Sequence, residues 1–87
     1  MTLVQIIQSA LKSGNVIIGY KESLNFIKIN SPKMVIMAKN IPESMREDIE
    51  HNAKLAKTEI KIFNGSSKEL GVICGKSFPI STIVIKK

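Results

Sequence analysis

The sequence is poor in the residues that build disulfide frameworks, metal centres and catalytic sites. Its 87 residues contain one cysteine, one histidine and no tryptophan. A single cysteine excludes an intrachain disulfide and favours a reducing compartment. Cys74 lies in the apolar run Leu70-Gly71-Val72-Ile73-Cys74. We therefore expect it to be a small buried hydrophobic residue and not a reactive thiol.

Long apolar segments are missing as well. The longest strongly apolar run, Met34 to Ala38, is too short to span a bilayer. The amino terminus has the spacing of an amphipathic helix, with apolar residues at Leu3, Val4, Ile7, Ala10 and Leu11. It lacks the basic segment and cleavage site of a signal peptide. We expect a cytoplasmic protein with no membrane partner.

Support for an enzymatic site is weak. His51 has the acidic neighbours Glu47, Asp48 and Glu50, which fit either a metal or acid/base cluster or a solvated helix face. Two ligands at helical spacing without a third nearby favour the solvated face. No nucleotide-binding glycine loop or nucleophile elbow is present. We expect no catalytic residues, no cofactor, no metal and no small-molecule substrate.

Positive charge is what the sequence has in excess. Thirteen lysine and arginine residues against seven acidic ones give a net charge of +6 and a pI of about 9.7. This balance is typical of nucleic-acid-binding domains. Arg46 is the only arginine, so a lysine-rich composition unrelated to any partner also accounts for the charge.

Helical and strand patterns alternate along the chain. We predict helices at residues 2–13, 21–30, 43–57 and 67–74, and strands at Val16 to Ile18, Met34 to Ala38, Ile60 to Phe63 and Ile80 to Ile85. Such alternation argues for helices on both faces of one small sheet. With 44% hydrophobic residues the chain can bury one compact core. We expect a single domain over residues 1–87.

Two details of the second helix matter below. Leu24, Ile27 and either Phe26 or Ile29 are the candidates for its buried side. The pair Ser31-Pro32 is expected to end it, because the residue before a proline disfavours helical geometry.

The first candidate site follows the strand that ends at Ile18. Gly19 lets the backbone come close to a partner. The next helix would direct free N–H groups and the positive end of its dipole to the same side. Lys21 adds a mobile full charge. Together they predict a site for an anion, with phosphate or the acceptor edge of a guanine as the target.

The second candidate site is the loop Gly75-Lys76-Ser77-Phe78-Pro79-Ile80-Ser81, which places hydrophobic side chains beside a charge. Phe78 and Ile80 either plug the end of the sheet or form an apolar shelf for an unstacked base. Proteins commonly read RNA loops and bulges through such unstacked bases.

Four separated segments then carry a family resemblance: Ile18 to Ser23, Met34 to Asn40, Glu47 to Leu55 and Glu69 to Phe78. In this order and spacing they resemble the L-thirty-e family of archaeal and eukaryotic large-subunit ribosomal proteins, within the L-seven-Ae superfamily of kink-turn RNA binders. The resemblance implies a three-layer α/β/α sandwich around a mixed four-stranded sheet. It also implies an RNA ligand with sheared G·A pairs and a sharply bent backbone.

By matched position, the resemblance implies one contact region at the start of the second helix. Gly19, Tyr20 and Lys21 would lie against the G·A pairs, with Lys21 near a guanine edge. Glu22 and Ser23 would support that contact.

The resemblance implies a second contact region from two later segments. Asn40 matches an RNA-facing asparagine of the family, and Lys39, beside it in the sequence, would contact a phosphate. Phe78 and Ile80 match loop positions that cradle an extruded nucleotide, which weakens the interpretation as plugs, and Lys76 adds a charge in the same loop.

Three departures from the family pattern reduce the expected contacts. Asn25 stands where relatives often carry a base-contacting lysine, and Pro79 stands where a basic or polar residue is common. The chain stops at Lys86-Lys87, where many members continue. We expect fewer accessory contacts and an unchanged fold.

Taken together, these observations predict a non-enzymatic RNA-binding protein of the large ribosomal subunit that stabilises a kink-turn. It would be a monomer when free, with other ribosomal proteins as possible neighbours. The main alternative is a superfamily member of a guide-RNA or RNA-processing particle. A protein-interaction module with incidental charge and a small enzyme using His51 remain as rivals.

Overall fold

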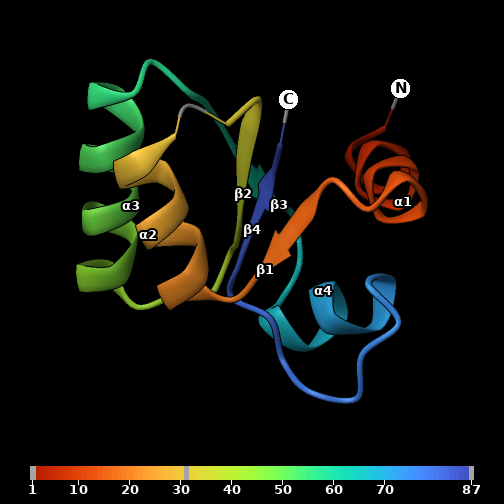
Figure 1. Cartoon of the computed structure of the whole chain (residues 1–87). Coiled ribbons are helices and arrows are strands. Elements are labelled where there is room, and N and C mark those ends of the chain that lie inside the picture. Colours follow the sequence, from red (N-terminus) through yellow and green to blue (C-terminus); the bar gives the residue numbers. More distant parts are fainter. Residues whose placement is uncertain (1, 31, 87) are drawn as a thin grey trace.

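The computed structural model describes residues 2–30 and 32–86. Its elements follow one another in the order α1 (Leu3–Ser13), β1 (Val16–Ile18), α2 (Tyr20–Ile29), β2 (Met34–Ala38), α3 (Glu43–Leu55), β3 (Glu59–Phe63), α4 (Ser67–Ile73) and β4 (Thr82–Ile85) (Figure 1). Ser31, part of the expected helix break, and Lys87, at the carboxyl end, lie outside the described residues.

The four strands form one mixed sheet in the order β1-β4-β2-β3. Strand β4 runs antiparallel to both β1 and β2, whereas β2 and β3 are parallel. Helices α2 and α3 cover one face of the sheet, and α1 and α4 cover the other (Figure 1). The expected three-layer α/β/α sandwich with a mixed four-stranded sheet is confirmed.

The core lies on both faces of the two central strands, which are buried along their whole length. Side chains alternate between the faces of a strand. Ile36 and Ile83 therefore pack toward α1 and α4, while Val35 and Val84 pack toward α2 and α3. Cys74 joins the first of these clusters, and burial raises the pKa of its thiol. The expectation of a small buried hydrophobic residue is confirmed.

Local chemistry explains where α1 begins and why α3 ends early. Thr2 caps α1, because its hydroxyl accepts from the Gln5 N–H at 3.2 Å while the Gln5 side chain accepts from the Thr2 N–H at 3.1 Å. Helix α3 ends at Leu55, two residues before the expected end. Lys57 has a φ of 56°, in the left-handed region, and cannot continue the helix.

Two further differences concern which side chains are buried. On α2, Phe26 packs against the core while Ile29 is 80% exposed, which settles the choice between them. Strand β4 begins at Thr82, not at Ile80, so Ile80 belongs to the preceding loop. Across the described ranges, the helices are too short and too polar to cross a membrane.

Candidate nucleic-acid interface

The sheet topology brings the two candidate sites together at one edge of the sheet. Strands β1, β2 and β3 all end there, and β4 begins there, because β4 is antiparallel to its neighbours. We call this the carboxyl edge. It consists of the segments 19–23, 39–40, 64–67 and 75–81.

Backbone hydrogen bonds connect these segments directly. The Gly19 N–H donates to the Thr82 carbonyl at 2.9 Å, and the Ala38 N–H donates to the Ser81 carbonyl at 2.9 Å. The Lys39 N–H donates to the Gly65 carbonyl at 3.0 Å. The carboxyl edge is therefore a connected surface and not a set of independent loops.

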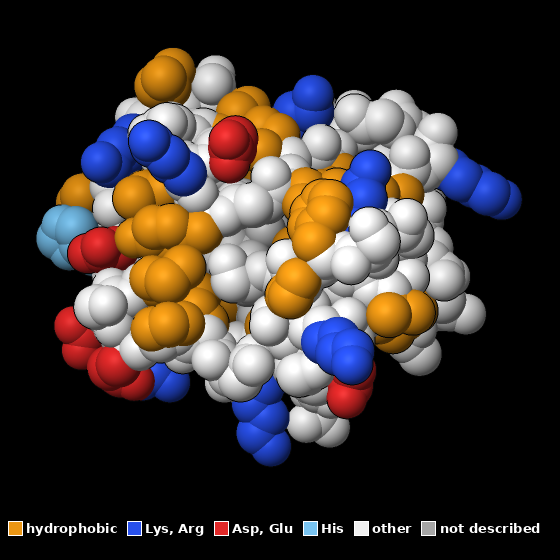
Figure 2. All heavy atoms as spheres, turned by 90° about the horizontal axis from the view of Figure 1, so that it is seen from below, with side chains coloured by type: hydrophobic (Ala, Val, Ile, Leu, Met, Phe, Trp, Pro, Cys, Tyr) orange, Lys and Arg blue, Asp and Glu red, His pale blue; other side chains and the backbone are white. Residues whose placement is uncertain are grey.

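Figure 2 shows the carboxyl edge from below. Hydrophobic side chains gather on both halves of this face, and a band of uncharged groups and backbone separates them. Lysines project around the rim, while most acidic side chains lie toward the side of α2 and α3. The surface thus combines apolar contact area with positive charge.

Helix α2 begins at Gly19 in a conformation that favours glycine. Gly19 has φ 110° and ψ 151°, and no side chain caps the helix at this end. A Cβ at this position would lie 2.9 Å from an oxygen of Glu22, which folds back over the start of the helix. The Glu22 carboxylate is well placed to interact with the positive end of the helix dipole.

Lysines carry the available positive charge of the edge. Within residues 2–30 and 32–86, the ion pairs formed by lysine and arginine side chains involve only Arg46 and Lys61. Lys21, Lys39 and Lys76 are all exposed. Their ammonium groups are therefore free to meet an anionic ligand.

Tyr20 is held by the neighbouring helix. Its hydroxyl donates to the Asp48 carboxylate on α3 at 3.0 Å, and its ring packs against the core between α2, α3 and the sheet. Partial burial raises the pKa of Tyr20, and the hydrogen bond and negative charge of Asp48 raise it further. The hydroxyl proton of Tyr20 is thus used in the hydrogen bond to Asp48. No pattern along the chain predicts this pair, because the two residues are 28 positions apart.

Two buried hydroxyls lie behind the edge. Ser23 and Thr82 are both 0% exposed, and their oxygens have no hydrogen-bond partner among the described residues. Ser23 cannot reach a ligand at the surface. Its side chain is buried beneath the start of α2.

Asn40 has a structural bond as well as an exposed position. Its side-chain oxygen accepts from the Ser67 N–H at 2.9 Å, so the amide nitrogen remains as the free donor. A hollow beside it is lined by Lys39, Asn40, Asn64, Gly65, Ser66 and Glu69. The segment 64–66 was not among the site residues predicted from the sequence, although it lines this hollow.

The structure separates the two hydrophobic residues of the loop 75–81. Phe78 is 53% exposed, whereas Ile80 is 2% exposed and packs in the core with α1 and α4. The expectation that Ile80 forms part of an exposed shelf is therefore wrong, because its side chain plugs the end of the sheet. Phe78 alone has the exposure that a shelf requires.

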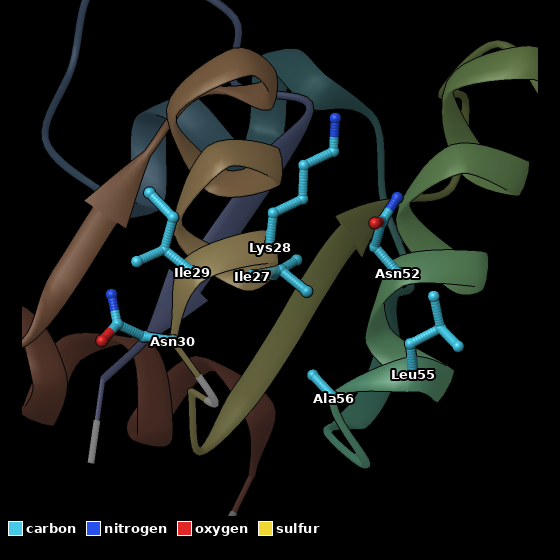
Figure 3. A pocket seen from close by; sticks show the side chains of 7 residues that line it. All are labelled: Ile27, Lys28, Ile29, Asn30, Asn52, Leu55 and Ala56. Carbon is cyan, nitrogen blue, oxygen red and sulfur yellow. The ribbon is translucent and has the colours of Figure 1, made fainter.

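Another hollow lies at the opposite end of the molecule, between the last turns of α2 and α3 (Figure 3). Ile27, Asn52 and Ala56 face the space between the helices, and Lys28 is the one charged side chain among the described residues that line it. It contains none of the expected site residues. The carboxyl edge is therefore the stronger candidate site.

Comparisons with known proteins give a family for the chain. The model of the family described as ribosomal protein L7Ae/L30e/S12e/Gadd45 matches residues 1–87. The large ribosomal subunit protein eL30 of Methanothermobacter thermautotrophicus is 42% identical over 80 residues, which are 92% of this chain and 82% of the relative. The eL30 protein of Saccharolobus solfataricus is 43% identical over 79 residues, which are 91% and 73% of the two chains.

Solved structures with low identity share the fold. A Bacillus halodurans protein of unknown function superimposes with a TM-score of 0.85 at 13% identity, covering 97% of this chain and 83% of its own. The Giardia lamblia 15.5kD RNA binding protein superimposes with a TM-score of 0.78 at 21% identity, covering 98% and 71%. Both support the three-layer sandwich described above.

The contrast between Ile80 and Phe78 generates a stability prediction. Ile80→Ala should lower the free energy of unfolding by about 2–5 kcal/mol, because it leaves a cavity in the core. Phe78→Ala should cost roughly 1 kcal/mol, because about half of the ring is already in water. Denaturant unfolding of both variants measures the difference. Equal losses would show that Phe78 is as much a core residue as Ile80.

The Tyr20–Asp48 pair generates a pH prediction. The chain has one tyrosine and no tryptophan, so ultraviolet titration of the phenol reports Tyr20 alone. The folded protein should titrate above the ordinary value of 10.0. The stability that this shift contributes is fully present below the unfolded pKa and is lost as the pH rises through the folded pKa.

Asp48→Ala should lower the Tyr20 pKa toward the ordinary value without removing the effect of burial. Titration in denaturant provides the unfolded reference. An unchanged midpoint in the folded Asp48→Ala variant would contradict the assigned hydrogen bond.

Proposed function

The chain belongs to the ribosomal protein L7Ae/L30e/S12e/Gadd45 family, and we propose on this basis that it binds RNA in the large ribosomal subunit. Its carboxyl edge recognises and stabilises a kink-turn. The relatives at 34–43% identity are named as large ribosomal subunit proteins and not as enzymes. Under this proposal the chain uses no cofactor and acts as one domain. It is a monomer when free and is associated with cytoplasmic ribosomes.

The observation that carries the proposal is the combination of free lysines and one exposed aromatic ring on a connected edge. Lysines near phosphates supply affinity that does not depend on sequence. Proteins recognise irregular RNA by shape and by bases that leave the helical stack. The half-exposed ring of Phe78 provides a stacking surface for such a base.

The residues at the start of α2 contact the G·A pairs under this proposal. Gly19 brings the backbone close, and Lys21 donates to a guanine edge from the first turn of the helix. Tyr20 contributes the edge of its ring, because its hydroxyl is held by Asp48. Glu22 covers the start of the helix, and Ser23 packs beneath it.

The segments 39–40 and 75–81, on the other side of the carboxyl edge, contact the RNA backbone and the extruded nucleotide. Lys39 and Lys76 lie near phosphates, and Asn40 donates through its free amide nitrogen. Phe78 supports the unstacked base. Ile80 acts from inside the protein by fixing the loop, and not as a contact residue.

Sedimentation of the tagged chain with large ribosomal subunits separates a ribosomal role from service in a guide-RNA particle. Sequencing of RNA crosslinked to the chain in cells identifies the bound site. Recovery of guide RNAs without ribosomal RNA would contradict the ribosomal assignment.

The direct test compares two RNAs of equal length and charge, one containing a kink-turn and one a straight duplex. We expect a much higher affinity for the kink-turn at near-physiological salt, because the edge recognises shape. A filter-binding or fluorescence titration measures both constants. Equal affinities would overturn the proposal, since charge attraction alone would then explain the binding.

A further prediction of the proposed function concerns Lys21. Lys21→Ala should weaken kink-turn binding by about 1–3 kcal/mol, the range for a positioned contact to a base edge. The matched control is Lys12→Ala, because Lys12 lies in the last turn of α1, away from the carboxyl edge. Both variants should unfold like the parent protein, because exposed lysines contribute little to stability. Similar losses of affinity would show that Lys21 belongs only to a diffuse positive field.

A further inference from the structure

Gly71 stands in the middle of α4 at a place where no larger residue fits. A Cβ at this position would lie 2.2 Å from the Phe78 carbonyl oxygen and 3.6 Å from the Pro79 Cα. Gly71 has ordinary helical geometry, and glycine weakens a helix interior by roughly 0.5–1 kcal/mol relative to alanine. The need for a glycine here therefore comes from the close approach of the Phe78 backbone.

Three contacts hold the loop 75–81 against α4. At its start, the Lys76 N–H donates to the Gly71 carbonyl at 2.9 Å. In its middle, the Phe78 carbonyl oxygen occupies the space beside Gly71 that a side chain would otherwise fill. At its end, the Ile80 N–H donates to the Ser67 carbonyl at 2.9 Å, and the Ile80 side chain is buried. The loop thus lies flat on one short segment of helix while the Phe78 ring projects outward.

Helix α4 is itself connected to the other half of the edge. The Asn40 side chain accepts from the Ser67 N–H, one residue into α4. The position of Phe78 relative to the segment 39–40 therefore depends on how closely the loop packs on α4. A loop that is already in its bound position loses less conformational entropy when it binds.

We propose that Gly71 is a positioning residue of the RNA-binding edge. Its missing side chain lets α4 support the Phe78 backbone directly, and this contact holds the Phe78 ring in place for an unstacked base. The part of this inference that concerns RNA rests on the proposed function. The placement of the Phe78 ring by Gly71 is independent of it.

The decisive variant is Gly71→Ala, which adds one buried methyl group and changes no surface charge. The Phe78 carbonyl must then move by about 1 Å to restore ordinary contact distances. Val72→Ala is the matched control, because Val72 is the next residue in the same helix and is 69% exposed. Thermal melts establish the temperature at which each variant is folded.

The first readout needs no RNA. Fluorine NMR of protein labelled with fluorophenylalanine gives one signal for each of three phenylalanines, and Phe78→Leu identifies the signal of Phe78. Gly71→Ala should shift the Phe78 signal and leave that of Phe26, on the opposite face of the sheet, in place. Val72→Ala should leave both in place. An unshifted Phe78 signal in folded Gly71→Ala would overturn the proposal.

The second readout is a double-mutant cycle on kink-turn affinity. Gly71→Ala should weaken binding by no more than the loss of one stacked base, about 5- to 150-fold. In a Phe78→Ala background, the same substitution should cause no further loss. Equal losses in both backgrounds would overturn the proposal, because Gly71 would then act on the whole fold and not through Phe78.

A failure of Gly71→Ala to fold and a failure of the proposed function can both be told apart from a failure of this inference. If Gly71→Ala does not fold, Ile80→Val loosens the same loop by one methyl group and enters the same cycle, with the same two outcomes. If the parent protein does not prefer the kink-turn, the proposed function fails. The fluorine spectra then decide alone whether Gly71 places the Phe78 ring.

Discussion

The insertion of β4 between β1 and β2 is the constraint on which the rest of the structure depends. The last strand of the chain pairs at the centre of the sheet and runs antiparallel to both neighbours. Its amino end therefore meets the carboxyl ends of β1 and β2. Without this reversal, the loop 75–81 would lie at the opposite end of the molecule from Gly19 and Asn40.

Periodicity predicted the elements well and their spatial order poorly. Strands β1 and β2 have the expected bounds, because each is a short apolar run between polar turns. The alternation of helix and strand led to helices on both faces of the sheet. The mixed sheet came only from the family resemblance, because hydrophobic spacing does not record the direction of a strand.

The candidate site shows the same limit at the level of single residues. Phe78 and Ile80 are both hydrophobic and two positions apart, and the sequence does not say which one is buried. In the structure the Ile80 N–H donates to the Ser67 carbonyl and the Ile80 side chain is buried, whereas Phe78 is half exposed. Likewise, the bonds of Tyr20 to Asp48 and of Asn40 to Ser67 join segments that are distant in sequence.

Under the proposed function, specificity at the carboxyl edge comes from the placement of its lysines, because the arginine, which is better suited to recognise phosphate, is paired elsewhere. Arg46, the only arginine, pairs with Glu43 and Glu50 on its own helix. Arginine offers a rigid two-pronged donor, whereas lysine is a flexible point charge. The proposed RNA-binding edge, which depends on lysines, can therefore discriminate between RNA shapes only when the backbone beneath it is fixed. The hydrogen bonds among Gly19, Ala38, Ser81 and Thr82 provide that fixed frame.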